Sequence, residues 1–469
     1  MAHTNALTEI RDPATPTASA SRGRLEILLA LAAFAVLCIV VLTVAPQLVE
    51  PDDYAYRASI VAMTQGHFLS LSAAQFHALS TQMASSLGGL RVRAAGPGGG
   101  TPGVAQWVRL ADGRWISEKD PGYPFLAAPF QALGIIRLAP LFYGALACLG
   151  LFAGARRWLG RYGGAAAVVL FCSCGAAMLF AWRDYMPTFT DASLIAAGTG
   201  ALLWAVLAAE ATARRRTWTG LAGFVAIEAA VFVRYTDVVV LACAVVAVLA
   251  AWRLRSVKLP ASALAWWLGS VAVFGAGVSA FDDVVYGGPL KSGYQPGEIT
   301  FSLGAVWRNL RFMPSHLIEA LPMLVLGLAG LAWIIARGVR LRHADGDPGT
   351  VARHDAGVGI ALAASWASVW GLYATYNWTA QPGLSTLQAV RFYVPAIGAI
   401  SLLGAWLATR LPRREPVAAV ALVAAVAAMF GLGIWSYGDM MPPMSSGQHF
   451  IGHGPPPGGA RRQLRDRGS

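Results

Sequence analysis

Charged side chains are scarce in this chain. They make up 13% of its 469 residues, whereas a soluble protein carries roughly 25%. Hydrophobic residues reach 56%, and the mean hydropathy is +0.54. This balance excludes an ordinary soluble enzyme and favours an all-α polytopic membrane protein.

Other features are also missing. No Walker loop is present, and no Gly-x-Gly-x-x-Gly follows a strand, which argues against a nucleotide-sugar site. No internal repeat is visible, which argues against transporters built from repeated halves. The cysteines all fall in apolar runs, where they behave as small hydrophobes rather than disulfide partners or metal ligands. They are Cys38, Cys148, Cys172, Cys174 and Cys243.

Long apolar runs are abundant, and many approach the roughly 20 residues that a membrane helix needs. We predict about eleven transmembrane helices. They lie near residues 25–46, 137–155, 163–182, 192–210, 218–234, 236–252, 262–281, 317–336, 357–376, 393–409 and 417–436. The first run is too long for a signal peptide and lacks a small-residue cleavage site, so it is expected to remain.

Basic residues cluster at alternate connections between these runs. The clusters are Arg22/Arg24, Arg156/Arg157/Arg161, Arg214/Arg215/Arg216, Arg253/Arg255/Lys258, Arg337/Arg340/Arg342 and Arg410/Arg413/Arg414. By the positive-inside rule these connections are cytoplasmic, which places the N-terminus inside and the C-terminus outside. The net charge of +12 is then topogenic, so no nucleic-acid partner is expected. The predicted location is a plasma or bacterial inner membrane, crossed many times.

The predicted organisation has three parts. Residues 1–24 form a disordered cytoplasmic tail, 25–436 the transmembrane domain, and 437–469 a disordered outer tail. A long outer loop covers about 47–121. It is expected to hold a surface helix over 54–75, a mobile glycine-rich stretch from Gly96 to Gly103, and a small hairpin over 106–117 that turns at Asp112-Gly113. On the inner side, residues 343–356 predict a polar linker.

The acids Glu50, Asp52 and Asp53 follow the first run directly, and acids beside a bilayer are costly unless they have partners or work. Further ionisable residues gather at the predicted outer ends of other runs. They are Lys119, Asp120, Asp184, Asp191, Arg234, Asp237, Asp282, Asp283, Lys291 and Arg391. Any one of them can be a solvated loop charge. As a set, carboxylates and cations on one side suit a base acting on a hydroxyl beside a bound phosphate, as in glycosyl transfer from a lipid phosphate.

Several short motifs along residues 45–400 resemble the GT-C membrane glycosyltransferases, in the broad group of the protein O-mannosyltransferases and aminoarabinose transferases. The first is the acidic pair Asp52-Asp53 with Tyr54 and Tyr56. The others are the segment 117–124 (SEKDPGYP), Tyr185-Met186-Pro187 with Asp191, the segment 233–236 (VRYT), the segment 286–294 (YGGPLKSGY) and the segment 391–395 (RFYVP).

The resemblance implies an inverting transfer from a polyprenyl-phosphate sugar at the outer face of the membrane. It makes Asp52, Asp53 and Asp191 the catalytic carboxylates. Asp52 takes the proton of the acceptor hydroxyl, with Asp53 left open as the alternative base, and Asp191 or Asp53 orients the acceptor or the sugar. The resemblance assigns the donor phosphate to Lys119 and Arg391, helped by Arg234 or Lys291, so Lys119 and Arg391 should converge near Asp52 and Asp191. Sugar or acceptor contacts fall to Tyr54, Tyr123, Tyr185 and Tyr294. Trp107 and Trp115 either stack on sugars or anchor the chain at the interface.

Some points differ from the family or stay open. The lysine segment reads Lys119-Asp120-Pro121 rather than Lys-Pro-Pro, and no sizeable soluble domain follows the last run, which favours a small, glycan or lipid acceptor. No cofactor is implied, and a divalent metal on the acidic pair stays open. The sugar stays open between hexoses such as mannose and pentoses such as arabinose in the cell envelope. The alternative is a transporter or lipid flippase, for which Glu228 is the main candidate deep in a span.

Overall fold

The computed structural model describes most of the chain. The described residues are 16–48, 50–85, 106–254, 259–294, 297–341, 347–410 and 417–441, with the side chains of 16–22, 347–348 and 417–423 left out. The predicted mobile stretch from Gly96 to Gly103 and most of both predicted tails lie outside these residues. One difference is visible at the N-terminus, where helix α1 (Pro16–Thr43) begins inside the predicted tail.

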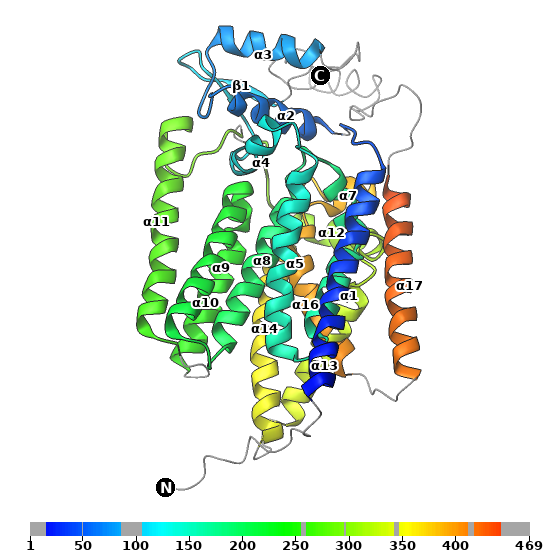
Figure 1. Cartoon of the computed structure of the whole chain (residues 1–469). Coiled ribbons are helices and arrows are strands. Elements are labelled where there is room, and N and C mark those ends of the chain that lie inside the picture. Colours follow the sequence, from blue (N-terminus) through cyan, green and yellow to red (C-terminus); the bar gives the residue numbers. More distant parts are fainter. Residues whose placement is uncertain are drawn as a thin grey trace.

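Seven described helices are long and apolar enough to cross a membrane, so the chain is a multi-pass membrane protein. They lie side by side in Figure 1. They are α1, whose apolar part is Gly23–Thr43, α5 (Leu138–Leu159), α8 (Thr188–Leu207), α9 (Ala213–Val233), α10 (Val238–Arg253) with the preceding turn η1 (Tyr235–Asp237), α11 (Ala261–Tyr286) and α14 (Asp347–Ala374).

Two further spans are broken, which raises the number to nine if each bent pair counts once. Helices α6 (Gly163–Cys172) and α7 (Gly175–Trp182) meet at 60°, and α12 (Leu303–Ala320) and α13 (Leu324–Arg340) meet at 106°. The last two predicted runs correspond to η2 (Val394–Ala396) with α16 (Ile397–Arg410), and to α17 (Val417–Met440). The number eleven therefore stays a prediction, because breaks and short helices make the count depend on the definition of a span.

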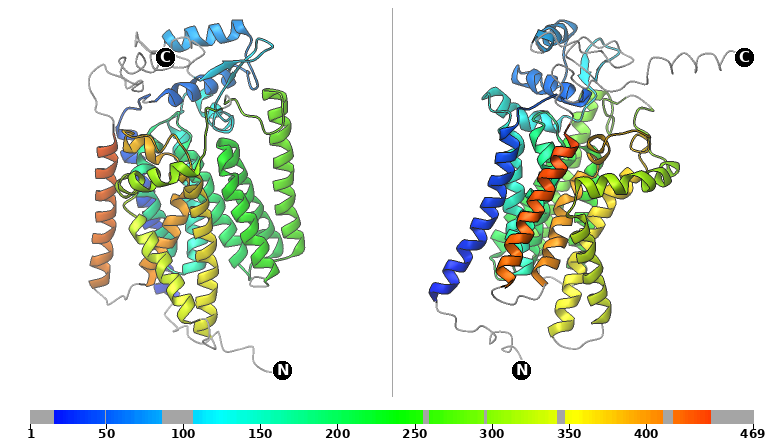
Figure 2. Two further views of the ribbon diagram at one scale, coloured as in Figure 1. Left: turned by 180° about the vertical axis from the view of Figure 1, so that it is seen from behind. Right: turned by 90° about the vertical axis from the view of Figure 1, so that its right-hand side faces the viewer.

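A smaller layer covers one end of the long helices (Figures 1 and 2). It consists of α2 (Pro51–Thr64), α3 (Ala73–Ser85), the antiparallel strands β1 (Trp107–Arg109) and β2 (Trp115–Ser117), and α4 (Gly122–Ala132). The prediction of one surface helix over 54–75 was wrong in extent. Helix α2 ends at Thr64, and Gly66 follows with φ of 85°, a left-handed conformation that stops helices.

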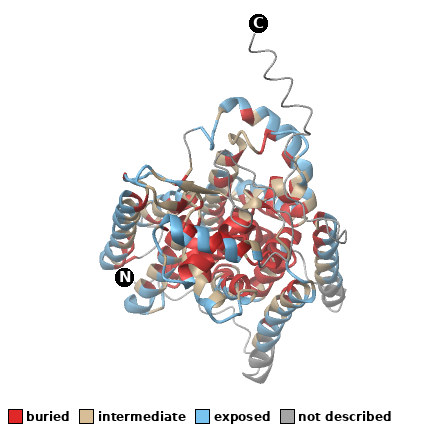
Figure 3. Ribbon diagram, turned by 90° about the horizontal axis from the view of Figure 1, so that it is seen from above, coloured by how far each residue is buried: buried red, intermediate tan, exposed pale blue. Residues whose placement is uncertain are grey.

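Glycine lets the central helices approach closely. A Cβ added at Gly150 of α5 would lie 2.5 Å from the carbonyl oxygen of Ala197, and one added at Gly200 of α8 would lie 2.2 Å from Gly150. Such small-residue contacts are the usual way for membrane helices to pack. Viewed from the covering layer, buried residues gather at the centre while outlying helices are largely exposed (Figure 3).

Buried charge also joins the helices at the end opposite the covering layer. The Asp355 carboxylate of α14 accepts a hydrogen bond from the Trp158 indole at 3.0 Å and pairs with Arg337 at 3.5 Å and Arg410 at 3.2 Å. These partners lie on α5, α13 and α16. The predicted linker over 343–356 was therefore wrong from Asp347 onward, where α14 begins and Asp355 joins it to other helices. Residues 343–346 lie outside the described part of the chain.

Candidate active site

The acids that follow α1 are held by the first turn of α2. Pro51 occupies an early position of that helix, where its missing N–H costs nothing, and Asp52 and Asp53 fall in the first turn, where the helix dipole favours negative charge. The Asp53 carboxylate accepts the backbone N–H of Glu50 at 2.9 Å. The local sequence thus fixes three carboxylates within four residues, facing the ends of the long helices.

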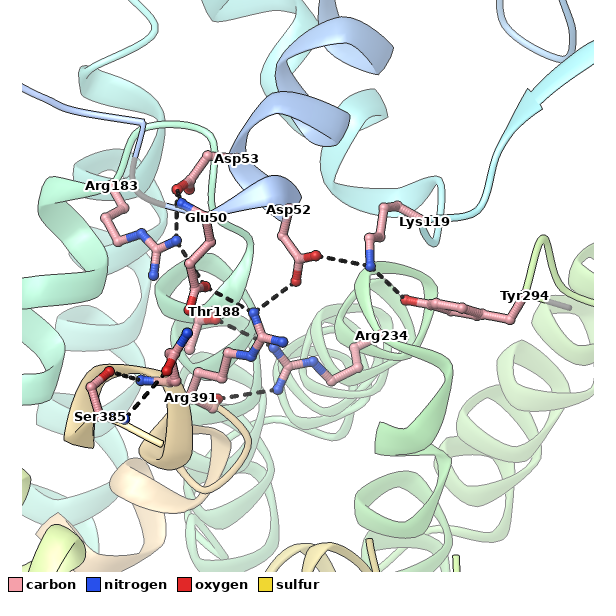
Figure 4. Close-up of polar contacts among 11 residues, drawn as sticks. Glu50, Asp52, Asp53, Lys119, Arg183, Thr188, Arg234, Tyr294, Ser385 and Arg391 are labelled. Atoms are coloured by element: carbon pink, nitrogen blue, oxygen red, sulfur yellow. Dashed lines mark hydrogen bonds and ion pairs between the residues drawn. The ribbon is translucent and has the colours of Figure 1, made fainter. Parts of the chain in front are cut away.

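These carboxylates alternate with cations in one continuous chain of contacts (Figure 4). Arg183 contacts Asp53 at 2.7 Å and Glu50 at 3.1 Å. Arg391 then contacts Glu50 at 2.9 Å and Asp52 at 2.7 Å. Lys119 contacts the other oxygen of Asp52 at 3.0 Å, and its ammonium donates to the Tyr294 hydroxyl at 3.3 Å. We call these six charged residues the alternating chain: Asp53, Arg183, Glu50, Arg391, Asp52 and Lys119.

Arg391 reaches this chain from a far part of the sequence. It follows the short helix α15 (Thr386–Val390), which Ser385 caps by accepting the Gln388 N–H at 3.4 Å. The guanidinium lies over two rings, 4.7 Å from the centroid of Trp378 and 4.6 Å from that of Phe392. Aromatic faces stabilise a cation without neutralising it, so Arg391 keeps a fixed orientation toward Asp52.

Lys119 is brought in by the start of α4. A Cβ at Gly122 would lie 2.3 Å from the backbone of Phe232, so glycine lets this turn rest on the end of α9. In the same turn the Asp120 carboxylate accepts the Tyr235 N–H at 3.4 Å. The Lys119 side chain is only 6% exposed. A buried ammonium needs a paired acid, and Asp52 supplies it.

The pairing sets the protonation states around Asp52. Burial would raise the pKa of Asp52, but the charges of Lys119 and Arg391 outweigh it and hold that pKa well below its usual range. Burial would lower the pKa of Lys119, and the Asp52 carboxylate raises it instead. The same competition between burial and the acids Asp52 and Glu50 raises the pKa of Arg391. All three groups are therefore charged at neutral pH.

A second group of charges lies beside the first. Arg234, at the end of α9, lies 3.6 Å from the fully buried Asp191 carboxylate of α8, and it donates to the Thr188 hydroxyl at 3.3 Å and to the Arg391 carbonyl at 3.4 Å. Asp237 is also buried. Burial raises the pKa of nearby Asp120 to about 7. The backbone of Arg391 thus links the two groups.

The other predicted residues are placed differently. Tyr294 contacts Lys119, but Lys291 is exposed and its ammonium donates to the Gly287 carbonyl at 3.0 Å, so the structure does not bring it to the alternating chain. Tyr123 is fully buried and donates to the Asp184 carbonyl, while Tyr185 donates to Gln131 at 3.1 Å.

Tyr54 and Asp53 are buried in α2. Trp107 and Trp115 pack on the ring of Phe76 in the covering layer, with Trp115 stacked at a centroid distance of 4.0 Å. These rings have protein partners in this structure, which accounts for their positions without a ligand.

Arg183 was missed in the sequence, and Glu50 was noticed only as part of the acid cluster. Arg183 is fully buried between two carboxylates, and Glu50 bridges it to Arg391. A signal was available for Arg183. It is a lone arginine at the predicted outer end of an apolar run, where the positive-inside rule expects few cations.

A small cavity that opens to solvent adjoins Lys119. It lies between α2, the strands, the start of α4 and the end of α11, and its lining is mainly apolar and aromatic. Its members include Met63, Phe68, Trp107, Lys119, Phe281 and Tyr286. Among the described residues, no group of three or more His, Cys, Asp or Glu side chains is arranged to hold a metal ion. The site can therefore supply a carboxylate, two cations and an apolar recess.

No family model and no curated protein matches the chain. Among solved structures, ArnT from Cupriavidus metallidurans bound to undecaprenyl phosphate aligns over 91% of this chain and 70% of its own, with 16% identity and a TM-score of 0.47. ArnT in the apo state aligns over 88% and 64%, with 16% identity and a TM-score of 0.45.

The Archaeoglobus fulgidus oligosaccharyltransferase, in a complex with zinc and sulfate, aligns over 69% of this chain and 45% of its own, with 15% identity and a TM-score of 0.40. All three alignments have TM-scores below 0.5 and identities of 16% or less. A similarity this distant does not by itself assign an activity, which has to be argued from the chain's own site.

Proposed function

We propose that this protein is an inverting membrane glycosyltransferase that moves a sugar from a polyprenyl-phosphate donor to a hydroxyl acceptor. The observation that carries the proposal is the position of Asp52 between Lys119 and Arg391. A base for the acceptor and two cations for a phosphate then lie within one contact of each other. The reaction would take place on the side of the membrane that carries the alternating chain, which we propose is the outer side.

The same geometry provides a sequence of events. With both cations in contact, the Asp52 carboxylate is a weak base. Burial would raise its pKa, but the charges of Lys119 and Arg391 outweigh burial and hold that pKa well below its usual range. A donor phosphate carries more negative charge than a carboxylate and can take over Lys119 and Arg391. Asp52 would then lose its stabilising partners, and its basicity would rise once the donor is bound.

The transfer itself needs one proton acceptor and one stabilised leaving group. Asp52 would take the proton of the acceptor hydroxyl while the oxygen of that hydroxyl forms a bond to the anomeric carbon of the sugar. The bond from that carbon to the phosphate oxygen breaks, and the electron pair leaves with the polyprenyl phosphate. Lys119 and Arg391 would stabilise that charge as it grows. Arg234 with Asp191 would orient the sugar or acceptor, and the cavity beside Lys119 suits the first apolar units of the prenyl chain.

The transport alternative has less support among the described contacts. The deepest acid singled out for it, Glu228 of α9, accepts the Ser270 hydroxyl at 2.9 Å, which is a contact between neighbouring helices. The other buried charges described here gather near the two ends of the long helices. A transport path would need polar groups between those ends.

The test is donor consumption by purified protein, offered a panel of polyprenyl-phosphate sugars including mannose and arabinose. Asp52→Asn keeps the size of the side chain but removes its basicity, so turnover should fall about 10²-fold or more. Asp283→Asn is the matched control, since Asp283 is exposed at the end of α11. Wild-type turnover in the Asp52→Asn protein would contradict the proposed role of Asp52. Inactivity of the wild-type protein with every donor would count against the proposed reaction.

A further inference from the structure

A second cavity lies at the other end of helix α9 from Arg234, between the first turns of α9 and α11. It opens to the surface of the molecule. Seven residues line it, and they include both polar and apolar side chains. They are Ala213, Arg214, Thr217, Trp218, Leu221, Ser262 and Trp266. A 21-residue helix is about 30 Å long, so this cavity is remote from the alternating chain. In Figure 1 the two helices start side by side at the end opposite the covering layer.

The three arginines at the start of α9 have different environments. Arg216 donates to the carbonyls of Ala205 at 2.9 Å and Val206 at 3.3 Å, near the end of α8. Arg215 lies 4.9 Å from the ring centroid of Trp204. Arg214 is exposed, lines the cavity, and has neither an acidic nor a hydrogen-bonding partner among the described residues. One cation of the run is thus left available at the cavity.

Two exposed tryptophans form the wall of the cavity. Trp218 is 57% and Trp266 is 61% exposed, and their rings lie 6.5 Å apart at 29°. The two rings face each other across the helices but stay more than half exposed. The buried contact between α9 and α11 is made by the neighbouring Trp267, which is fully buried against Gly220 and donates to the Thr217 carbonyl at 2.9 Å. Tryptophan at the start of a membrane span is typical of the boundary between headgroups and acyl chains.

We infer that this cavity is a binding site for an anionic phospholipid. The lipid phosphate would pair with Arg214 and accept a hydrogen bond from the Ser262 hydroxyl. The acyl carbons nearest the headgroup would lie against Trp218, Trp266 and Leu221. The dipoles of two long helices, which both start here, add positive potential at the same place. A zwitterionic lipid brings its own cation toward Arg214, and a free phosphate cannot use the apolar wall. The inference does not depend on the proposed transfer reaction.

The experiment is native mass spectrometry of the full chain in a neutral detergent, titrated with palmitoyl-oleoyl phosphatidylglycerol or with phosphatidylcholine of the same chains. The first phosphatidylglycerol should bind about fivefold more tightly than phosphatidylcholine, since one arginine near a lipid surface contributes about 1 kcal/mol. Arg214→Gln should remove this preference and Arg214→Lys should keep it. Arg215→Gln is the matched control, because it removes the same charge one residue away and should keep the preference.

Four results would overturn the inference. They are an unchanged preference in Arg214→Gln protein, an equal loss in Arg215→Gln protein, displacement of the lipid by inorganic phosphate, and tighter binding of a polyprenyl phosphate at this cavity. A measurement on the wild-type chain covers the case in which Arg214→Gln fails to fold. A photoactivatable phosphatidylglycerol should crosslink to the first turns of α9 and α11, and crosslinking spread evenly over the other spans would contradict the site.

Discussion

At the scale of single residues, the main feature is that Asp52 has two cationic partners from opposite ends of the sequence. Lys119 precedes α4 and Arg391 follows α15, yet each contacts a different oxygen of the same carboxylate. In this structure both cations are paired with the Asp52 carboxylate. Any anion that takes one cation therefore also changes the protonation behaviour of Asp52.

Arg391→Lys and Lys119→Ala should affect different steps. Arg391 contacts Glu50 and Asp52 through the same nitrogen, Nη1, and its Nε has no partner among the described residues. Lysine lacks the second donor with which a guanidinium binds a phosphate, so we expect the KM for the donor to rise roughly tenfold or more. Lys119→Ala should instead lower kcat by about 10²-fold, because charge on the departing phosphate is less stabilised. Steady-state kinetics with varied donor separates the two. Arg114→Lys, in the exposed pair with Asp112, is the control, and an equal change in all three variants would contradict the assignment.

Asp184 predicts a pH dependence of stability. Burial first, and then the charge of Asp53, raise the pKa of Asp184 to about 7 against the opposing effect of Arg137. An unfolded aspartate titrates near about 3.9. Between these values the folded chain binds more protons than the unfolded chain, so the contribution of Asp184 to stability falls as the pH rises from about 4 to 7.

Asp184→Asn cannot ionise and should escape this loss. At pH 8 we expect the variant to be more stable than the wild type by at least about 1 kcal/mol in the free energy of unfolding, and so to melt at a higher temperature in detergent. Near pH 4 the two melting temperatures should match. The comparison needs thermal unfolding at both pH values. A difference of the same size at both would show that the substitution acts through packing rather than ionisation.

The acids and cations that lie beside recognisable motifs, such as Asp52, Lys119 and Arg391, could be predicted as site residues from the sequence. Arg183 was not singled out. Its place at the outer end of an apolar run is a signal, but nothing in the sequence identifies Glu50 and Asp53, more than 100 residues away, as its partners. Lys291 illustrates the opposite error. It lies in a segment that resembles the family, but side-chain direction cannot be read from a motif.

At the scale of helices, close packing of α5 on α8 depends on missing side chains. Gly200→Val should therefore destabilise the protein, since the added Cβ would lie 2.2 Å from the backbone of Gly150 and both helices would have to separate. A penalty of about 1–3 kcal/mol or more is expected for such overpacking. The measurements are the melting temperature and the monodisperse fraction in detergent.

Gly275→Val provides the control for that substitution. Gly275 lies on α11, and a Cβ added there has nothing within 4 Å. The two variants share the same loss of backbone freedom and the same added bulk, so a difference between them reports packing alone. Equal melting temperatures would show that the contact between α5 and α8 adjusts easily.

Apolar length predicted the long helices well, because hydrophobic runs near 20 residues leave few alternatives in a bilayer. It could not predict the breaks. The run over 163–182 bends by 60° at Ser173 and Cys174, and α12 turns by 106° into α13. The residues on both sides of the first break are apolar, so hydropathy carries no information about that bend. Helix α12 carries charged residues such as Arg308 and Arg311, and the predicted run over 317–336 took in only its last turn.

At the scale of the whole molecule, the arginine clusters predict orientation. Helix α9, with Arg216 in its first turn, starts at the end opposite the covering layer, and α17, with Tyr437 in its last turn, ends near that layer (Figure 1). A reporter fused after Tyr437 should be active outside the membrane, and one fused after Arg216 should be active inside. Paired alkaline phosphatase and fluorescent protein fusions measure this. Reporters on the same side would contradict the predicted topology and the proposed outer site.

The alternating chain also limits how this protein can diverge. Its three acids and three cations balance, and each inner member has a partner on both sides. Loss of one member leaves an uncompensated buried charge next to it, so a single neutral replacement is disfavoured. Divergent versions of this protein are therefore expected to keep all six positions or to change them in pairs of opposite sign. Asp53 with Arg183 is the pair that can drift first, because it lies at the end of the chain farthest from Lys119.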